Sequence, residues 1–178
     1  HALNGTGALY VRDGVKLTPI LSGGSQEGNL RSGTESLPGI VSMTKALRMA
    51  IESSAGNLSR ITRVQNKLLN QLSGIEGVVI NTPITNAAPH IINFSVPGLK
   101  AEVLVHFLED EHIFVSTTSA CSSKRVKEST TLLAMNKGEN IAGSAIRLSL
   151  SLEQTEDIIE PFIIHLKNGI KKLTKVTR

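Results

Sequence analysis

Residues 91–115, IINFSVPGLKAEVLVHFLEDEHIFV, combine two kinds of periodicity and decide how the rest of the chain is interpreted. Residues 91–95 and 113–115 are short apolar runs rich in β-branched and aromatic residues, which favour strands. Between them, residues 101–109 repeat apolar side chains at helical spacing: Val103, Leu104, Phe107 and Leu108. The stretch therefore predicts a strand, a helix and a second strand.

The flanking sequence extends this pattern in both directions. Residues 77–80 and 145–150 read as strands, and residues 129–135 read as a short helix. Thr155 is a typical N-cap, followed by acidic Glu156 and Asp157 in the first turn of a last helix. The order β-β-α-β-α-β predicts an open α+β layer structure.

The N-terminal third has a different character. Residues 8–11 predict a hairpin strand closed by a turn at Asp13-Gly14, and residues 17–21 form a second apolar piece. Helical spacing recurs over residues 39–50 and 58–72. The small polar residues 53–57 interrupt it, so we expect two helices and two domains, residues 1–53 and 54–178.

Composition excludes several classes of protein. The chain has 178 residues, 40% of them hydrophobic, and only 3% aromatic, which fits one or two small domains with an aliphatic core. Its single cysteine excludes an internal disulfide framework and favours a cytoplasmic location. No apolar run is long enough to span a bilayer. The net charge of +4 is spread over helix faces with few aromatics, so we expect no direct nucleic-acid binding.

Residues 23–35, GGSQEGNLRSGTE, form the densest polar motif. Glycines permit tight turns whose amides cradle anions, while Arg31 and Thr34 supply a charge and a hydroxyl donor for a phosphate or carboxylate. A plain connection in which Arg31 pairs with Glu27 or Glu35 explains the same spacing, and slightly better. The motif alone leaves both readings open.

Arg147 lies in the strand of residues 145–150, with Ile146, Leu148 and Leu150 expected on one face. Arg147, Ser149 and Ser151 would then share the other face, where an arginine beside serines can hold a carboxylate through two hydrogen bonds. An ordinary solvent-facing arginine is the commoner case.

Cys121 stands among small hydroxyl residues, with Lys124 and Arg125 close behind. These surroundings favour an ionised, nucleophilic thiol, although a lone cysteine is usually a buried small hydrophobe. The five histidines show no paired spacing, so we expect no metal site.

Together, these segments resemble the C-terminal part of pyridoxal-phosphate-dependent cysteine desulfurases, in the class V aminotransferase superfamily. The resemblance rests on five segments in the family's order: residues 4–11 after its Schiff-base lysine, residues 23–35, the strand of residues 90–95, and residues 119–122 and 144–149. It implies an α/β protein, the C-terminal region of a fold-type I transferase. Its small domain would have a small mixed or antiparallel sheet with helices on one face.

The resemblance also implies roles. Cys121 would take sulfur from L-cysteine as a persulfide, Arg147 would hold the substrate carboxylate, and Thr34, supported by Arg31, would reach the phosphate of pyridoxal 5'-phosphate across a dimer interface. Partners would be a second subunit and a sulfur acceptor, either an iron–sulfur scaffold or a tRNA thiolation enzyme.

The sequence departs from the family at several points. The alignment puts the cofactor lysine two positions before His1, so we expect a fragment that is inactive by itself. Thr118 and Ser151 replace glycines common in relatives, which could alter flexibility near Cys121. A selenocysteine lyase, another class V aminotransferase, or a non-catalytic sulfur-relay or interaction module remain alternatives.

Overall fold

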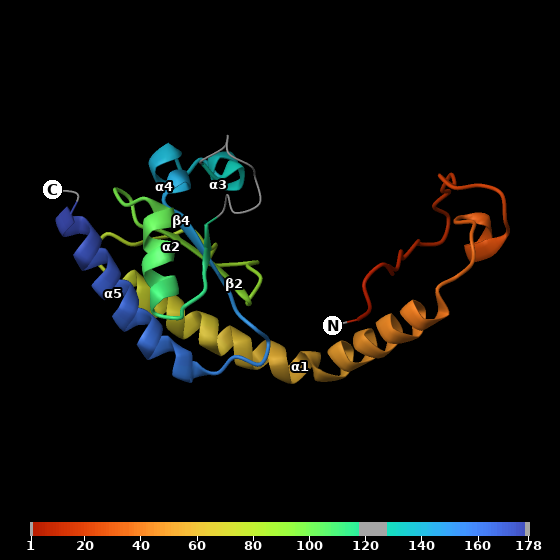
Figure 1. Cartoon of the computed structure of the whole chain (residues 1–178), viewed down its shortest axis with the longest axis horizontal. Helices are drawn as coiled ribbons and strands as arrows, with labels where there is room; N and C mark the ends of the chain where they lie inside the picture. Colours follow the sequence, from red (N-terminus) through yellow and green to blue (C-terminus); the bar gives the residue numbers. More distant parts are fainter. Residues whose placement is uncertain (1, 118–127, 177–178) are drawn as a thin grey trace. The chain divides into compact units, whose positions relative to one another are not determined.

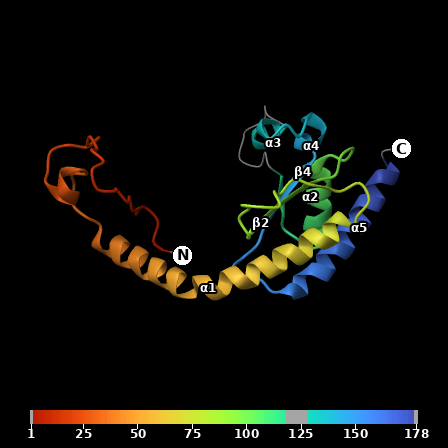
Figure 2. The same ribbon diagram turned by 180° about the vertical axis from the view of Figure 1, so that it is seen from behind.

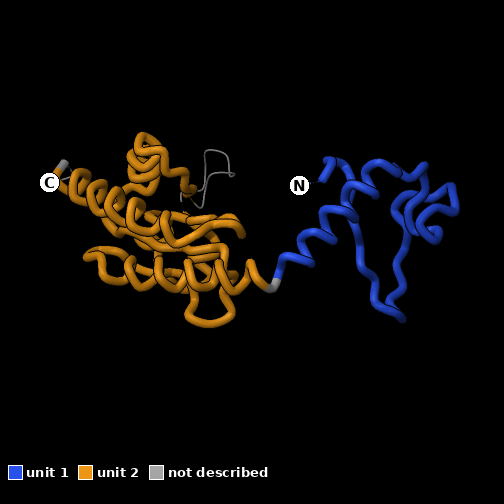
Figure 3. The backbone as a smooth tube through the Cα atoms, turned by 90° about the horizontal axis from the view of Figure 1, so that it is seen from below, with its two compact units in different colours: residues 1–55 blue, residues 56–178 orange. Residues whose placement is uncertain are grey.

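The structure is a computed structural model that describes residues 2–117 and 128–176. The chain divides into two compact units, His1–Ala55 and Gly56–Arg178, coloured separately in Figure 3. Each unit is described by itself.

The second unit is built on a four-stranded sheet. Its strands are β1 (Val79–Ile80), β2 (Ile91–Ser95), β3 (Ser116–Thr117) and β4 (Ala145–Ser149), in the spatial order β1-β2-β4-β3. Every neighbouring pair is antiparallel. The two longest strands, β2 and β4, lie at the centre, as expected where cross-strand contacts are most numerous.

Helices cover one face of this sheet (Figures 1 and 2). They are α2 (Ala101–Asp110), α5 (Ile159–Val176) and the part of α1 (Leu37–Ser73) that belongs to this unit. Their apolar faces meet alternate residues of β2 and β4 in one core, whose fully buried side chains include Leu68, Phe94, Leu104, Ile146 and Leu166. The predicted α/β fold, with a small antiparallel sheet and helices on one face, is confirmed.

Two short helices lie near one end of the sheet: α3 (Thr130–Ala134) and α4 (Glu139–Gly143). Ser129 caps α3 by accepting a hydrogen bond from the amide of Leu132. Leu132, Ala142 and Ala145 form a second small core there. The hydroxyl of Ser95 donates to the carbonyl of Ile141 at 2.8 Å and so ties α4 to β2.

The first unit has little regular structure before α1. It contains one short 3-10 helix, η1 (Gln26–Asn29), and extended segments linked by turns, including the expected turn at Asp13-Gly14. The hydroxyl of Ser32 donates to the carbonyl of Leu21 at 2.7 Å and closes the intervening segment into a loop.

Three expectations from the sequence are wrong. The helix does not break at residues 53–57, because the hydroxyls of Ser53 and Ser54 bond to carbonyls of the preceding turn and leave α1 continuous. No strand forms at residues 8–11, because a lone hairpin is marginal without further strands to pair with. The strand expected at residues 113–115 begins instead at Ser116, because the amide of Ile113 bonds back to Leu108 at the end of α2.

The last helix begins differently from its prediction, and one helix was missed. A 3-10 turn, η2 (Glu156–Ile158), precedes α5, and Thr155 bonds to the carboxylate of Asp157 rather than to a backbone amide. Helix α4 was not expected. Its N-cap, Gly138, has a positive φ of 78° and makes no side-chain capping hydrogen bond.

Candidate active site

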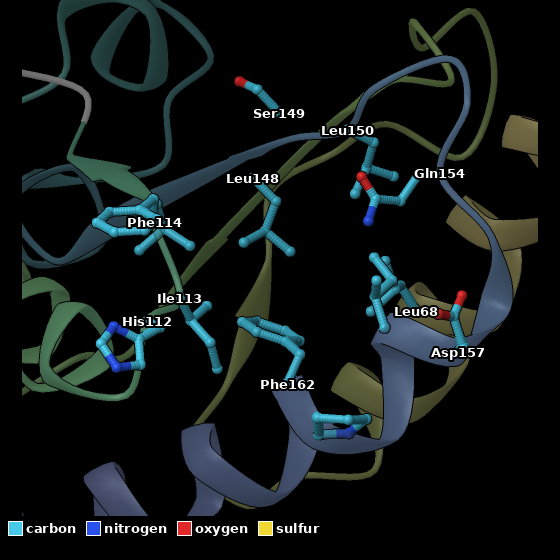
Figure 4. Close-up of a pocket in the computed structure, with 13 residues that line it drawn as sticks. Leu68, His112, Ile113, Phe114, Leu148, Ser149, Leu150, Gln154, Asp157 and Phe162 are labelled. Atoms are coloured by element: carbon cyan, nitrogen blue, oxygen red, sulfur yellow. The ribbon is translucent and has the colours of Figure 1, made fainter.

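Arg147 lies on the face of the sheet opposite α1, α2 and α5, whereas α3 and α4 cover one end of its own face at Ala145. Its neighbours in β4, Ile146 and Leu148, are buried in the core, whereas Arg147 and Ser149 are exposed. Figure 4 shows the side chains of Leu148 and Ser149 directed to opposite sides of the strand. The alternation expected from the sequence therefore holds for these residues. Ser151 lies beyond β4 and accepts a hydrogen bond from the amide of Glu153, so it belongs to a turn.

The register of the sheet places a polar row across this open face. Arg147 pairs with Ser116 of β3 on one side and with Asn93 of β2 on the other. One guanidinium nitrogen, Nη2, donates to the hydroxyl of Ser116 at 3.4 Å. A carboxylate arriving at this face would therefore meet a guanidinium flanked by neutral polar side chains.

Asn93 is held by a network that the sequence did not reveal. Asn81 is only 3% exposed. Its side-chain nitrogen, Nδ2, donates to the side-chain oxygen of Asn93 at 2.8 Å and to the hydroxyl of Ser95 at 2.7 Å. The only available signal was a polar residue inside the apolar run of residues 91–95. Its partner could be identified only once the register with residues 79–82 was known.

Residues 23–35 form an irregular loop in the first unit. Glu27 and Asn29 adopt positive φ values of 50° and 64°. The amide of Gly33 donates to the side chain of Gln26, and the guanidinium of Arg31 donates to the carbonyl of Ser32. These contacts fold the loop back on itself.

Gly33 leaves room for Arg31. Its φ is 117°, and a Cβ added there would lie 2.7 Å from Nη1 of Arg31. Among the described residues, Arg31 makes no ion pair with Glu27 or Glu35, the alternative considered from the sequence. Arg31 and Thr34 are exposed. They therefore offer a positive charge and a hydroxyl at the surface, which suit a phosphate.

The predicted site residues are divided between the two units. Arg31 and Thr34 belong to the first unit, and Arg147 belongs to the second. Cys121 lies outside the described residues. In the described part of the chain, no three His, Cys, Asp or Glu side chains gather as a metal site, and no helix is long and apolar enough to cross a membrane.

A pocket of about 430 Å³ lies on the helix side of β4 (Figure 4). Apolar side chains dominate its lining, among them Leu68, Ile113, Leu148 and Phe162. Its lining extends to Ser149 at the end of β4 but includes neither Arg147 nor Asn93 of the polar row.

Comparison with known proteins identifies the class. A family profile described as Aminotransferase class-V matches residues 1–162. The chain belongs to this family.

Particular relatives are more specific. The chain is 41% identical over 167 residues to a protein of Lactobacillus delbrueckii subsp. bulgaricus named NifS/IcsS protein homolog, covering 91% of this chain and 43% of that one. It is 36% identical over 174 residues to the cysteine desulfurase IscS of Dictyoglomus turgidum, covering 97% and 44%.

Solved structures agree with these sequence relatives. A NifS-like protein matches with a TM-score of 0.77 and 32% identity, over 92% of this chain and 42% of its own. A NifS-like protein from Rickettsia africae matches with a TM-score of 0.74 and 27% identity, over 88% and 41%. The chain thus spans less than half the length of the relatives it matches.

Proposed function

We propose that the protein to which this chain belongs is a pyridoxal-phosphate-dependent cysteine desulfurase. The observation that carries the proposal is the placement of Arg147 on the open face of the sheet, hydrogen-bonded to Ser116. Strand β3, which contains Ser116, ends at Thr117, and Cys121 follows four positions later in the sequence. The candidate carboxylate ligand and the candidate nucleophile therefore belong to neighbouring strands and the segment that follows them.

Arg147 and Cys121 have different roles in the proposed reaction. Arg147 holds the carboxylate of L-cysteine through charge-assisted hydrogen bonds and fixes its orientation. The thiolate of Cys121 then forms a bond to the substrate sulfur as the carbon–sulfur bond breaks. The electron pair of the broken bond stays with carbon, which takes up the proton of the substrate thiol. The products are L-alanine and a persulfide on Cys121.

The loop of residues 23–35 fits the phosphate of the cofactor. Arg31 and Thr34 supply donors, and the missing side chain at Gly33 leaves space for the guanidinium. When bound, pyridoxal phosphate supplies the electron sink for the carbon chemistry. The lysine that binds it would lie upstream of His1.

The remaining partners follow from the same proposal. Thr34 and Arg31 would serve the cofactor of the other subunit in a homodimer. The persulfide would pass to an iron–sulfur scaffold or a tRNA thiolation enzyme, and the reaction would take place in the cytoplasm.

The test uses the protein with its upstream segment restored. Wild type and Cys121→Ser are incubated with pyridoxal phosphate, L-cysteine and dithiothreitol, which reduces the persulfide and releases its outer sulfur as sulfide. Sulfide, alanine and the visible spectrum are measured. We expect a yellow protein in both cases. We expect alanine and sulfide only where Cys121 is present, because serine cannot carry a persulfide.

Other outcomes discriminate among the alternatives. A yellow protein that converts amino acids regardless of Cys121 would be an aminotransferase or a lyase. A colourless protein that still binds a sulfur acceptor would be an interaction module. Either result would overturn the desulfurase proposal.

A further inference from the structure

Asn93 and Arg147 form a close cross-strand pair. The backbone amide and carbonyl of Asn93 both bond toward β1: the amide donates to the hydroxyl of Thr82, and the carbonyl accepts from the amides of Asn81 and Thr82. Asn93 therefore has no backbone groups left for β4, and its pairing with Arg147 is of the non-hydrogen-bonded kind. In such pairs the side chains on one face are closest, with Cβ atoms about 4.5–5.5 Å apart.

A chain of hydrogen bonds fixes which way the Asn93 amide faces. The carbonyl of Ile141 can only accept, so the hydroxyl of Ser95 must donate its proton there. Ser95 can then only accept from Asn81, which requires the NH2 group of Asn81 on that side. The same NH2 group donates its second proton to the oxygen of Asn93. The oxygen of Asn93 is thus committed, and its NH2 group is left as the donor of the pair.

Two donor groups therefore lie side by side on the open face. The guanidinium of Arg147 has no acceptor atoms, and the NH2 group of Asn93 has none either. Such groups cannot bond to each other, but they can share one anion, and a carboxylate has lone pairs for both. Ile92 and Phe94 on either side are buried in the core, so alternation places Asn93 on the same open face as Arg147.

We propose that Asn93 is a second ligand of the substrate carboxylate and that Asn81 holds it in the donating orientation. This inference rests on the proposed function, because it takes the amino acid bound by Arg147 as its ligand. It adds a specificity determinant: a neutral donor next to the guanidinium selects a carboxylate over an uncharged amide at the same position.

The experiment measures binding rather than turnover. Full-length holoenzyme is titrated by calorimetry with L-alanine and with L-alaninamide, which lacks the charged carboxylate. We expect Asn93→Ala to weaken L-alanine binding by about 10-fold or more, since hydrogen bonds to charged groups contribute on that scale. Binding of L-alaninamide should weaken less than that of L-alanine, because its neutral carbonyl accepts a weaker hydrogen bond than a carboxylate does.

A double-mutant cycle separates direct binding from an effect through Arg147. In an Arg147→Ala background, Asn93→Ala should still weaken L-alanine binding several-fold, because the amide contacts the ligand itself. Asn93→Asp in the same background is the second variant. The aspartate keeps the oxygen that accepts from Asn81 but replaces the NH2 donor with a negatively charged oxygen. It should therefore weaken L-alanine binding at least as much as Asn93→Ala does. Ser116→Ala is the matched control on the other side of Arg147, with an expected change below about threefold, because its contact is long.

The outcomes are distinguishable. The role of Asn93 would be overturned, and the proposed function left standing, by either of two results. One is an equal loss of affinity for L-alanine and L-alaninamide in Asn93→Ala. The other is that neither Asn93 variant weakens L-alanine binding further in the Arg147→Ala background. If Arg147→Ala leaves L-alanine binding unchanged, the carboxylate site of the proposed function fails as well.

Discussion

The two units of the chain differ in where their apolar side chains lie. In the second unit, seventeen buried hydrophobic residues form one core, and all but Ile75 and Val96 belong to three helices and two strands. In the first unit, the only buried residue among residues 2–54 is Gly39, while Leu9, Tyr10 and Ile20 are 78%, 87% and 97% exposed. One unit therefore stabilises itself by burial, and the other is organised by local hydrogen bonds and turns.

This difference bears on function. The second unit presents Arg147 and Asn93 from strands packed against a core, which holds such side chains at fixed spacing. The first unit presents Arg31 and Thr34 from a loop whose contacts are mostly internal. Its exposed apolar residues fit a unit that is completed by other parts of a larger protein, as the proposed function requires. Five substitutions in the 178-residue chain test the contrast.

The largest effect is expected in the core of the second unit. Phe94 is fully buried, and Phe94→Ala should lower the free energy of unfolding by about 3–5 kcal/mol, because it leaves a cavity between the sheet and the helices. The matched change in the first unit, Ile20→Ala, should alter it by less than about 0.5 kcal/mol, because the side chain is already exposed. Urea unfolding measures both. Equal losses would show that the first unit has a core of its own.

A smaller loss of stability is expected from a substitution where α5 packs on α2. A Cβ at Gly169 would lie 2.6 Å from the ring of Phe107 and 2.9 Å from Leu104. Gly169→Ala should therefore destabilise by about 1–2 kcal/mol, since overpacking outweighs the gain of about 1 kcal/mol in helix propensity. Thermal unfolding followed by circular dichroism checks the sign. A rise in melting temperature would mean that the two helices can separate freely.

Gly56 gives the opposite prediction in α1. No atom lies within 4 Å of a Cβ added there, so Gly56→Ala should stabilise the chain by about 0.5–1 kcal/mol through helix propensity alone. The helical ellipticity should also rise. Unchanged ellipticity and stability would favour the break at residues 53–57 that the sequence suggested and would contradict a continuous α1.

The smallest effect concerns the ion pair between Lys67 of α1 and Glu156 of η2, the turn that precedes α5. Both side chains are substantially exposed, at 55% and 36%. Lys67→Met should therefore cost less than about 1 kcal/mol, and the cost should shrink as salt is added. Unfolding at low and high ionic strength measures this. A larger, salt-independent loss would mean that Lys67 acts through packing.

The sequence predicted the second unit well because its periodicities are unambiguous. Residues 91–95, 101–109 and 145–150 each show one clear spacing, and each forms the expected element within a residue or so. The break expected at residues 53–57 failed because serine hydroxyls can bond within a helix as well as end it. The intrinsic propensities of these small residues favour the end of a helix, but α1 continues through them.

The candidate site was predictable only in part. Arg147 could be assigned to the open face because alternation in a strand is a local property. Asn81 could not be connected with Asn93, since that contact depends on how β1 aligns with β2. Cross-strand register is a property of the assembled sheet, and it brings together residues twelve positions apart.

The most direct test of the proposed function is a search for the persulfide itself. Full-length holoenzyme is mixed with L-cysteine, alkylated and digested, and the peptide containing Cys121 is examined by mass spectrometry beside the alanine produced. The account predicts one added sulfur on that peptide, matched by one alanine per persulfide in a single turnover. Alanine formed without added sulfur on Cys121 would contradict it.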